Sequence, residues 1–202
     1  MTDTTQPGRR ERKRQQTLDH LCDIAWQLFE TEGFDSVTME RIADEADVAK
    51  GTLYKHFPVK EALLRHHFHR ELARAVPDLL PMLATLPSVE MQLREFMRHS
   101  AAWAETHQKY LLPYVQFRLS EPRSLGGEQR SGLDRLFTRF IADGQASGEL
   151  CNARDPQQLA HYLEFLYLGA MLRWLLQGGI TLATEYQQML DLFFHGLVRG
   201  ES

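Results

Sequence analysis

Apolar side chains recur at three- and four-residue spacing along most of the chain, which is the pattern of amphipathic α-helices. Leu21, Ala25 and Leu28 follow this spacing, and Gly33 comes soon after, where a left-handed residue commonly ends a helix. No segment alternates apolar and polar residues as a half-buried strand would. The pattern therefore predicts an all-α fold, with helices at about 16–32, 38–46, 50–57, 59–76, 88–106, 108–120, 128–147, 156–177 and 183–199.

Prolines divide these helices into two groups. Pro77, Pro81 and Pro87 follow one another closely, and each removes a backbone N–H and favours the end of a helix. We therefore expect a linker after Pro77, between a small N-terminal module and a larger helical bundle. The expected domains are a flexible basic arm at 1–14, a small helical domain at 15–60 and a helical bundle at 61–202.

Two short helices separated by a tight turn are the most informative feature of the small domain. Thr38 offers a hydroxyl N-cap to the first of them. Ala43 and Ala46 give this helix a small-residue surface that a second helix can cross. Leu53 and Phe57, four residues apart, give the second helix an apolar inner face. This arrangement is typical of a helix-turn-helix, whose second helix projects from the body of the domain.

The outer face of that second helix has the chemistry of a DNA-reading surface. It combines cations, hydroxyl groups and a glycine that allows close approach, and these groups suit phosphate contact and base readout in a major groove. The alternative is an ordinary solvated helix face. The nearby acidic residues lie on the preceding helix and in the turn, so we expect them to be segregated from this face. The outer face and its flanks comprise Lys50, Gly51, Thr52, Tyr54, Lys55 and His56.

Composition restricts the classes of function. The chain has 202 residues, 43% of them hydrophobic and 25% charged, which is sufficient for a buried core. Its net charge is −4, so DNA binding depends on local charge, including the basic run from Arg9 to Arg14. Cys22 and Cys151 are too few and too far apart for a disulfide scaffold. The polar N-terminus and the lack of a long apolar stretch predict a cytoplasmic protein without a membrane span.

The last two predicted helices are unusually apolar. Helix 156–177 carries large apolar residues around nearly its whole circumference, so it must be covered on all sides. Helix 183–199 adds a second apolar surface. We expect these two helices to form a four-helix interface in a homodimer, because a two-fold pair of recognition helices needs a dimer. The alternative is a purely intramolecular core.

The N-terminal region resembles the DNA-binding domain of the TetR (tetracycline-repressor-like) family over about residues 16–65. Two positions depart from the family pattern. Asp47 stands where glycine is usual in the turn, so we expect backbone strain there. Ala49 stands where serine or threonine usually caps the recognition helix. The resemblance lies in Leu28-Phe29, Gly33-Phe34, Thr38-Met39, Ile42-Ala43, Ala46, Val48, the run from Lys50 to Phe57, Lys60-Glu61 and Leu63.

The resemblance implies roles for individual residues in DNA binding. Thr38 would meet a phosphate at the start of the first short helix, and Lys50 and Thr52 would face bases or the groove edge. Tyr54, His56 and Lys60 would bind phosphates, and Gly51 would permit close approach. Lys55 belongs to the same outer face. The DNA-binding set is therefore Thr38, Lys50, Gly51, Thr52, Tyr54, Lys55, His56 and Lys60.

The family's helical bundle holds a small-molecule effector, so the resemblance implies a site for a small aromatic or apolar ligand here. Aromatic residues of the bundle would line that site, although aromatic residues at helical spacing also serve as ordinary core. Arg118 and Arg173 would either orient a polar end of the ligand or pair with Glu164. The candidate lining residues are Trp103, Tyr110, Tyr114, Phe117, Tyr162, Phe165 and Trp174.

No catalytic or metal-binding constellation accompanies these features. His66, His67 and His69 lack the four-residue spacing that places two metal ligands on one helix face, and we expect them to be solvated or to face the linker. We predict no metal site, no cofactor and no enzymatic activity. The predicted function is a ligand-responsive, DNA-binding transcriptional regulator: a homodimeric repressor that a small-molecule effector releases from a palindromic operator. The alternative is a helical enzyme or a protein-interaction module with an incidental helix-turn-helix-like segment.

Overall fold

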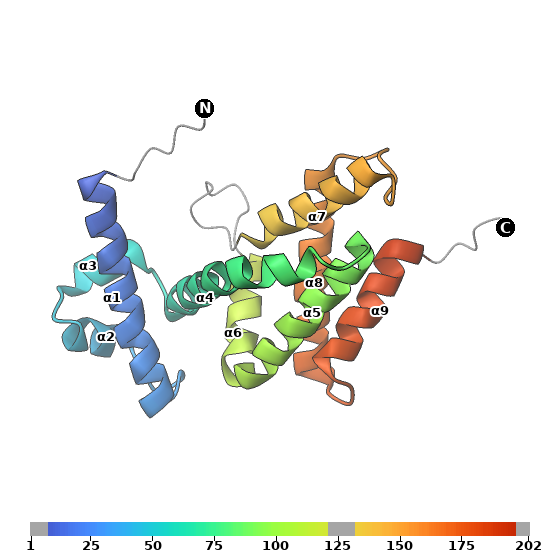
Figure 1. Cartoon of the computed structure of the whole chain (residues 1–202). Coiled ribbons are helices and arrows are strands. Elements are labelled where there is room, and N and C mark those ends of the chain that lie inside the picture. The colour runs from blue at the N-terminus through green and yellow to red at the C-terminus, as the bar shows by residue number, and fades with distance from the viewer. Residues whose placement is uncertain (1–7, 121–131, 197–202) are drawn as a thin grey trace. The chain divides into compact units, whose positions relative to one another are not determined.

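The computed structural model describes residues 8–120 and 132–196, and within them the chain is helical and forms no strand (Figure 1). The all-α prediction is therefore confirmed. The helices are α1 (Arg9–Glu32), α2 (Met39–Glu45), α3 (Lys50–His56), α4 (Lys60–Leu83), α5 (Val89–Thr106), α6 (Gln108–Ser120), α7 (Leu133–Ser147), α8 (Pro156–Gln177) and α9 (Leu182–His195).

The chain divides into two compact units, Met1–Phe68 and His69–Ser202. In the first unit α1 lies beside the short pair α2 and α3 (Figure 1), and the beginning of α4 completes the core. Fully buried side chains from all of these helices meet there, because each helix has one apolar face. They include Leu21, Phe29, Ile42, Leu53, Leu63 and Leu64. The domain boundary expected at residues 60 and 61 stays a prediction.

The first helix begins earlier than the flexible arm predicted at 1–14 allows. Residues 1–7 lie outside the described part of the chain, and α1 starts at Arg9. Arginine, lysine and glutamate are good helix formers, and Glu11 pairs with Arg14 at 3.3 Å one turn along the helix. The basic side chains from Arg9 to Arg14 therefore project from a helix rather than from an extended arm.

The fourth helix also differs from the prediction, which ended it at Pro77. It continues to Leu83 with Pro77 and Pro81 inside it. Both prolines lie on the exposed side, where water can solvate the carbonyl groups that lose their intrahelical hydrogen bonds. The covalent connection between the two units is therefore a continuous helix instead of a loop linker.

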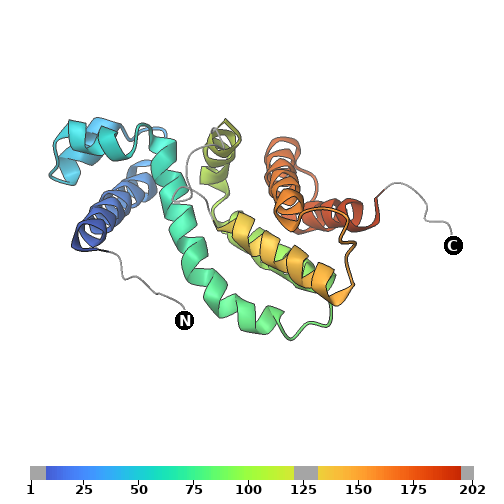
Figure 2. The same cartoon turned by 90° about the horizontal axis from the view of Figure 1, so that it is seen from above.

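The second unit is a bundle of α5 to α9 together with the remainder of α4. Figure 2 shows α5 beside α7 and α8 beside α9, and these pairs pack against one another. The carboxylate of Glu149, in the α7–α8 connection, accepts the backbone N–H groups of Val89 and Glu90 at 2.8 and 3.0 Å and so caps α5. None of the described helices is long and apolar enough to cross a membrane. The core includes Leu93, Met97, Leu111, Phe137, Leu163 and Tyr186.

Candidate DNA-binding surface and effector domain

Backbone hydrogen bonds fix the turn between α2 and α3. Thr38 caps α2 as predicted, since its hydroxyl accepts the N–H of Arg41 at 3.1 Å. At the other end Asp47 adopts a left-handed φ of 51°. Its N–H reaches the Asp44 carbonyl at 3.3 Å, and the Val48 N–H reaches the Ala43 carbonyl at 3.0 Å. These two bonds form a Schellman motif, which reverses the chain and places α3.

The third helix has one buried side and one exposed side. Leu53 and Phe57 are buried, as the spacing predicts, and Ala49 provides no side-chain cap. Gly51 has a helical backbone and no neighbouring atom within 4 Å of a Cβ placed on it. Nothing inside the protein therefore requires glycine at this position, although glycine weakens a helix. The exposed residues of this helix are Lys50, Gly51, Thr52, Tyr54 and Lys55.

A carboxylate of α2 reaches this exposed side of α3. The hydroxyl of Tyr54 donates a hydrogen bond to Oε1 of Glu40 at 3.1 Å. Hydrogen bonding to its own backbone lowers the pKa of Glu40 most, and the Tyr54 hydroxyl and the charge of Lys50 lower it further. The bond to Glu40 raises the pKa of Tyr54, so this hydroxyl keeps its proton. The acids of α2 are thus less segregated from the outer face than the sequence indicated, and the sequence interpretation missed the contact of Glu40 with this face.

Neighbouring groups set the protonation of His56 and the hydrogen bonding of Lys60, two further predicted contact residues. Burial lowers the pKa of His56 most, and the positive charges of Lys55 and Arg14 lower it further, so this imidazole is neutral near pH 7. Arg14 of α1 is therefore close enough to act on the end of α3. The ammonium of Lys60 donates to the Phe34 carbonyl at 2.6 Å and lies 4.6 Å from the centre of the Phe34 ring. Its first role in the free protein is to hold the α1–α2 connection.

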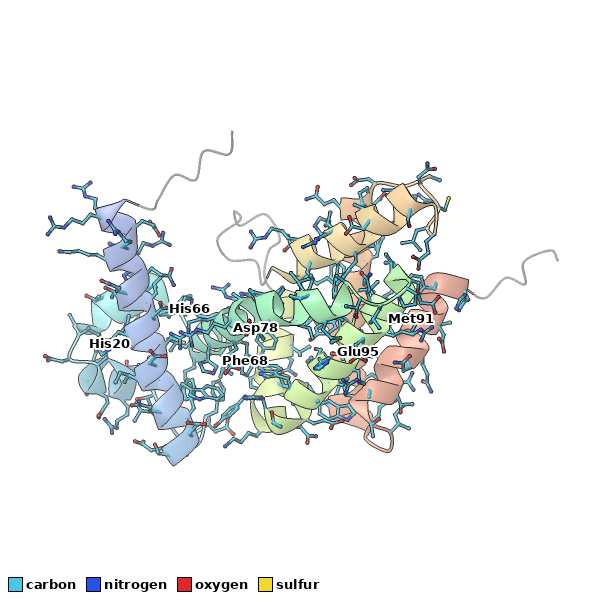
Figure 3. All side chains as sticks on the ribbon, in the orientation of Figure 1. His20, His66, Phe68, Asp78, Met91 and Glu95 are labelled. Carbon is cyan, nitrogen blue, oxygen red and sulfur yellow. The ribbon has the colours of Figure 1, made fainter. Side chains whose placement is uncertain are left out.

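The histidines of α4 are structural rather than solvated, which corrects the expectation from spacing. His67 is buried and stacks on Trp26 of α1, with ring centroids 3.8 Å apart. His66 (labelled in Figure 3) pairs with Asp19 of α1 at 3.1 Å. The reason is that α4 turns this side toward α1, where Phe68 also lies buried. Among residues 8–120 and 132–196, no group of histidine, cysteine or acidic residues is arranged to hold a metal ion.

The seven candidate effector residues differ in how deeply they are buried. Tyr110 and Tyr114 of α6 and Trp174 of α8 are buried. Trp103 and Phe117 are half-buried, and the indole N–H of Trp103 donates to Glu71 of α4 at 3.0 Å. In contrast, Tyr162 and Phe165 lie on the exposed side of α8.

A nearly buried ion pair joins helices in the second unit. Arg118 of α6 donates to Glu164 of α8 at 2.7 Å, with side chains only 11% and 10% exposed. Arg118 also contacts His69 of α4. Arg173, by comparison, pairs with Glu185 of α9 at 3.3 Å. Of the two interpretations offered for Arg118, pairing with Glu164 is therefore confirmed, and it links α4, α6 and α8 around one guanidinium.

The outer side of α8 is an exposed apolar stripe. It follows helical spacing, so its members lie on one face, with the exposed Gly169 between them. Leu192 adds a further exposed apolar side chain on the neighbouring helix α9, at 55% exposure. The stripe comprises Tyr162 (55% exposed), Phe165 (43%), Leu166 (43%) and Leu176 (63%).

Comparison with known proteins decides the class of this molecule. The profile of the family described as "Bacterial regulatory proteins, tetR family" matches residues 21–66, from the buried side of α1 through α2 and α3 into α4. The chain belongs to the TetR family. It is therefore a helix-turn-helix transcriptional repressor of the ligand-responsive kind and not an enzyme, as the sequence predicted.

Relatives of this TetR-family chain match it well beyond the helix-turn-helix. The transcriptional repressor KstR of Mycobacterium tuberculosis is 27% identical over 192 residues, which cover 92% of this chain and 80% of KstR. The crystal structure of Thermus thermophilus FadR in complex with lauroyl-CoA has a TM-score of 0.78 and 25% identity, covering 92% of this chain and 97% of that one. Bacillus subtilis FadR in complex with stearoyl-CoA shares the fold, with a TM-score of 0.62, 17% identity and coverage of 89% and 98%.

Proposed function

We propose that this TetR-family repressor binds a palindromic operator as a homodimer and releases it when a long-chain acyl thioester occupies the bundle. The observation that carries the DNA-binding part is the exposed side of α3. It presents Lys50, Thr52 and Lys55 around a glycine that no internal contact requires. A glycine that costs helix stability without an internal reason is explained by the close approach of an external surface.

The operator-binding roles of the individual residues follow from this surface. Lys50 and Thr52 face the bases or the groove edge, Gly51 lets the backbone approach, and Lys55 lies on the same side. Thr38, Tyr54, His56 and Lys60 contact phosphates, the last after giving up carbonyl partners in the α1–α2 connection. The basic residues at the start of α1 add a second phosphate-binding element, and the regulator acts in the cytoplasm, where the operator lies.

The homodimer is supported by the apolar stripe on α8. Four large apolar side chains on one helix face are costly to leave in water, and Leu192 adds an exposed apolar side chain on the neighbouring helix α9. A second copy related by a two-fold axis covers this face with the same face of its own α8 and α9. We therefore assign Tyr162 and Phe165 to the dimer interface, although the sequence placed them in the effector site.

The effector class is supported by the relatives. Thermus FadR, at 25% identity over nearly the whole chain, binds lauroyl-CoA. We propose that a long acyl chain lies among the aromatic residues of the bundle, with Trp103, Tyr110, Tyr114, Phe117 and Trp174 as its lining. Binding would act on DNA through α4, the helix that belongs to both units.

The test begins with selection of duplexes from a random library by the purified full-length protein. We expect enriched sites with two-fold symmetry, with half-site centres about 10–10.5 base pairs apart or a near multiple of that spacing. Lys50→Ala should weaken binding and reduce the slope of log affinity against log salt by about 1.

Lauroyl-CoA should lower operator affinity at least about tenfold, whereas coenzyme A and free laurate serve as controls. A library without enrichment contradicts operator binding, and unchanged affinity with lauroyl-CoA contradicts the effector class alone.

A further inference from the structure

The hydrogen bond between Tyr54 and Glu40 uses the hydroxyl that Tyr54 would offer to DNA. A tyrosine hydroxyl has one proton and can donate it to one acceptor at a time. In the free protein that acceptor is the Glu40 carboxylate, at 3.1 Å. A phosphate oxygen would need the same proton, because a phosphate has no donor of its own to offer. DNA binding through Tyr54 therefore requires the exchange of one anionic acceptor for another.

A second donor on the same domain surface is held in the same way. The guanidinium of Arg41 donates to Glu45 at 2.6 Å and to Glu32 at 3.2 Å. Both of these bonds are charge-assisted, and their carboxylates imitate the oxygens of a phosphate. Carboxylates therefore accept hydrogen bonds from two side-chain donors of this domain, Tyr54 and Arg41.

Glu40 also interacts with a positive charge of α3. Its carboxylate is near enough to Lys50 for that ammonium to lower the pKa of Glu40. The same attraction offsets the positive potential that Lys50 presents to an approaching duplex. Lys50 and Tyr54 thus both lose part of their attraction for phosphate to one acidic residue.

Resting on the proposed operator binding, we propose that Glu40 is a competing acceptor built into the DNA-binding surface. It holds the Tyr54 hydroxyl and offsets Lys50, and so weakens the hold of the protein on any phosphate backbone. Because non-specific binding is almost entirely electrostatic, a weaker hold on phosphate leaves a larger share of the binding free energy to base contacts. Glu40 in this sense lowers the affinity of the protein for every duplex, and it touches no base.

A double-mutant cycle tests this role in the full-length protein. Affinities of wild type, Glu40→Ala, Tyr54→Phe and the double variant are measured for a duplex selected by wild type and for a scrambled duplex of equal length. Glu40→Ala should bind both duplexes roughly two- to fivefold more tightly, in proportion to a lost exposed polar contact. Tyr54→Phe should cost more affinity in the Glu40→Ala background, where the hydroxyl is free for phosphate.

The matched control is Asp44→Ala, which removes an exposed acid from the same helix and leaves the Tyr54 bond intact. It should tighten binding less than Glu40→Ala and leave the cost of Tyr54→Phe unchanged. Thermal melting verifies that every variant is folded.

Four results overturn the proposal. If Glu40→Ala binds more weakly than wild type, Glu40 positions Tyr54 for DNA instead of competing for it. If Asp44→Ala tightens binding equally, or if the cost of Tyr54→Phe does not grow without Glu40, only general charge is at work. Equal affinity of wild type for selected and scrambled duplexes removes the proposed operator binding itself, and the competing role of Glu40 with it.

Discussion

Asp47 lies in the turn of the helix-turn-helix with a φ of 51°. A left-handed backbone places Cβ close to the following carbonyl oxygen, and aspartate tolerates this better than most residues with a side chain. The Schellman bonds to Asp44 and Ala43 require this conformation. Among the described residues other than glycine, the left-handed backbone expected from the sequence is confined to Asp47.

Replacement of Asp47 separates backbone strain from side-chain effects. Asp47→Gly should raise the free energy of unfolding by about 0.5–1 kcal/mol, because glycine adopts positive φ without a steric penalty. Asp47→Ala should lower it by about 1 kcal/mol, since alanine pays that penalty without a polar side chain to offset it. Calorimetric melting of both variants checks the order. If alanine proves as stable as glycine, the turn does not hold Asp47 in the left-handed region.

The role of a single residue could be predicted from the sequence where that role is set by the residue's own helix. The N-cap of Thr38 and the buried positions of Leu53 and Phe57 follow from local spacing, and the structure confirms them. The contact between Glu40 and Tyr54 depends instead on how α2 crosses α3, which no periodicity encodes. His67 was misplaced for the same kind of reason, because its burial depends on the partner surface around Trp26.

Whole helices show a similar division between local and tertiary causes. The existence of the helices follows from apolar spacing. The predicted end of the fourth helix before Pro77 is wrong, because α4 continues through Pro77 and Pro81. A proline stops a helix when the carbonyls it leaves unpaired have no other partner. Pro77 and Pro81 lie on the exposed side, so water fills that role. Whether a proline is exposed depends on how the helices pack. The helix end at Leu83 therefore could not be predicted from the sequence.

The pair of Arg118 and Glu164 makes a prediction about how α6 and α8 are held together. Their side chains are nearly buried, so removal of one leaves the other charge without its partner in a poorly solvated place. Glu164→Leu alone and Arg118→Met alone should each lower the free energy of unfolding by about 3 kcal/mol. Chemical denaturation followed by circular dichroism measures both.

The double variant Arg118→Met with Glu164→Leu is the control for this prediction. It replaces the pair by apolar side chains and leaves neither charge behind, so it should be more stable than the sum of the single losses implies. Losses that simply add would mean that the two groups are not coupled across the helices.

For the whole molecule, the apolar excess of the last two helices had two explanations, a dimer or a large internal core. In the structure, α8 has a buried side and an exposed side. Leu163, Tyr167 and Met171 are buried within the bundle, while Leu166 and Leu176 lie exposed on the other side. Composition could not indicate which residues of α8 the bundle covers, because that depends on how the helices pack; the structure shows that Leu166 and Leu176 stay exposed.

Leu166→Glu tests the assembly, because it introduces a charge at the centre of the exposed stripe of α8. A second copy could cover that charge only at a large desolvation cost, so the variant should be monomeric at micromolar concentration in light scattering. Its affinity for the selected duplex should fall at least about tenfold, since one half-site then binds without the other.

Met91→Glu is the matched control: Met91 on α5 (labelled in Figure 3) is 45% exposed, close to the 43% of Leu166, and lies outside α8 and α9. Met91→Glu should keep the mass and the affinity of wild type. Equal masses for wild type and Leu166→Glu would mean that the stripe is not the surface through which two copies meet.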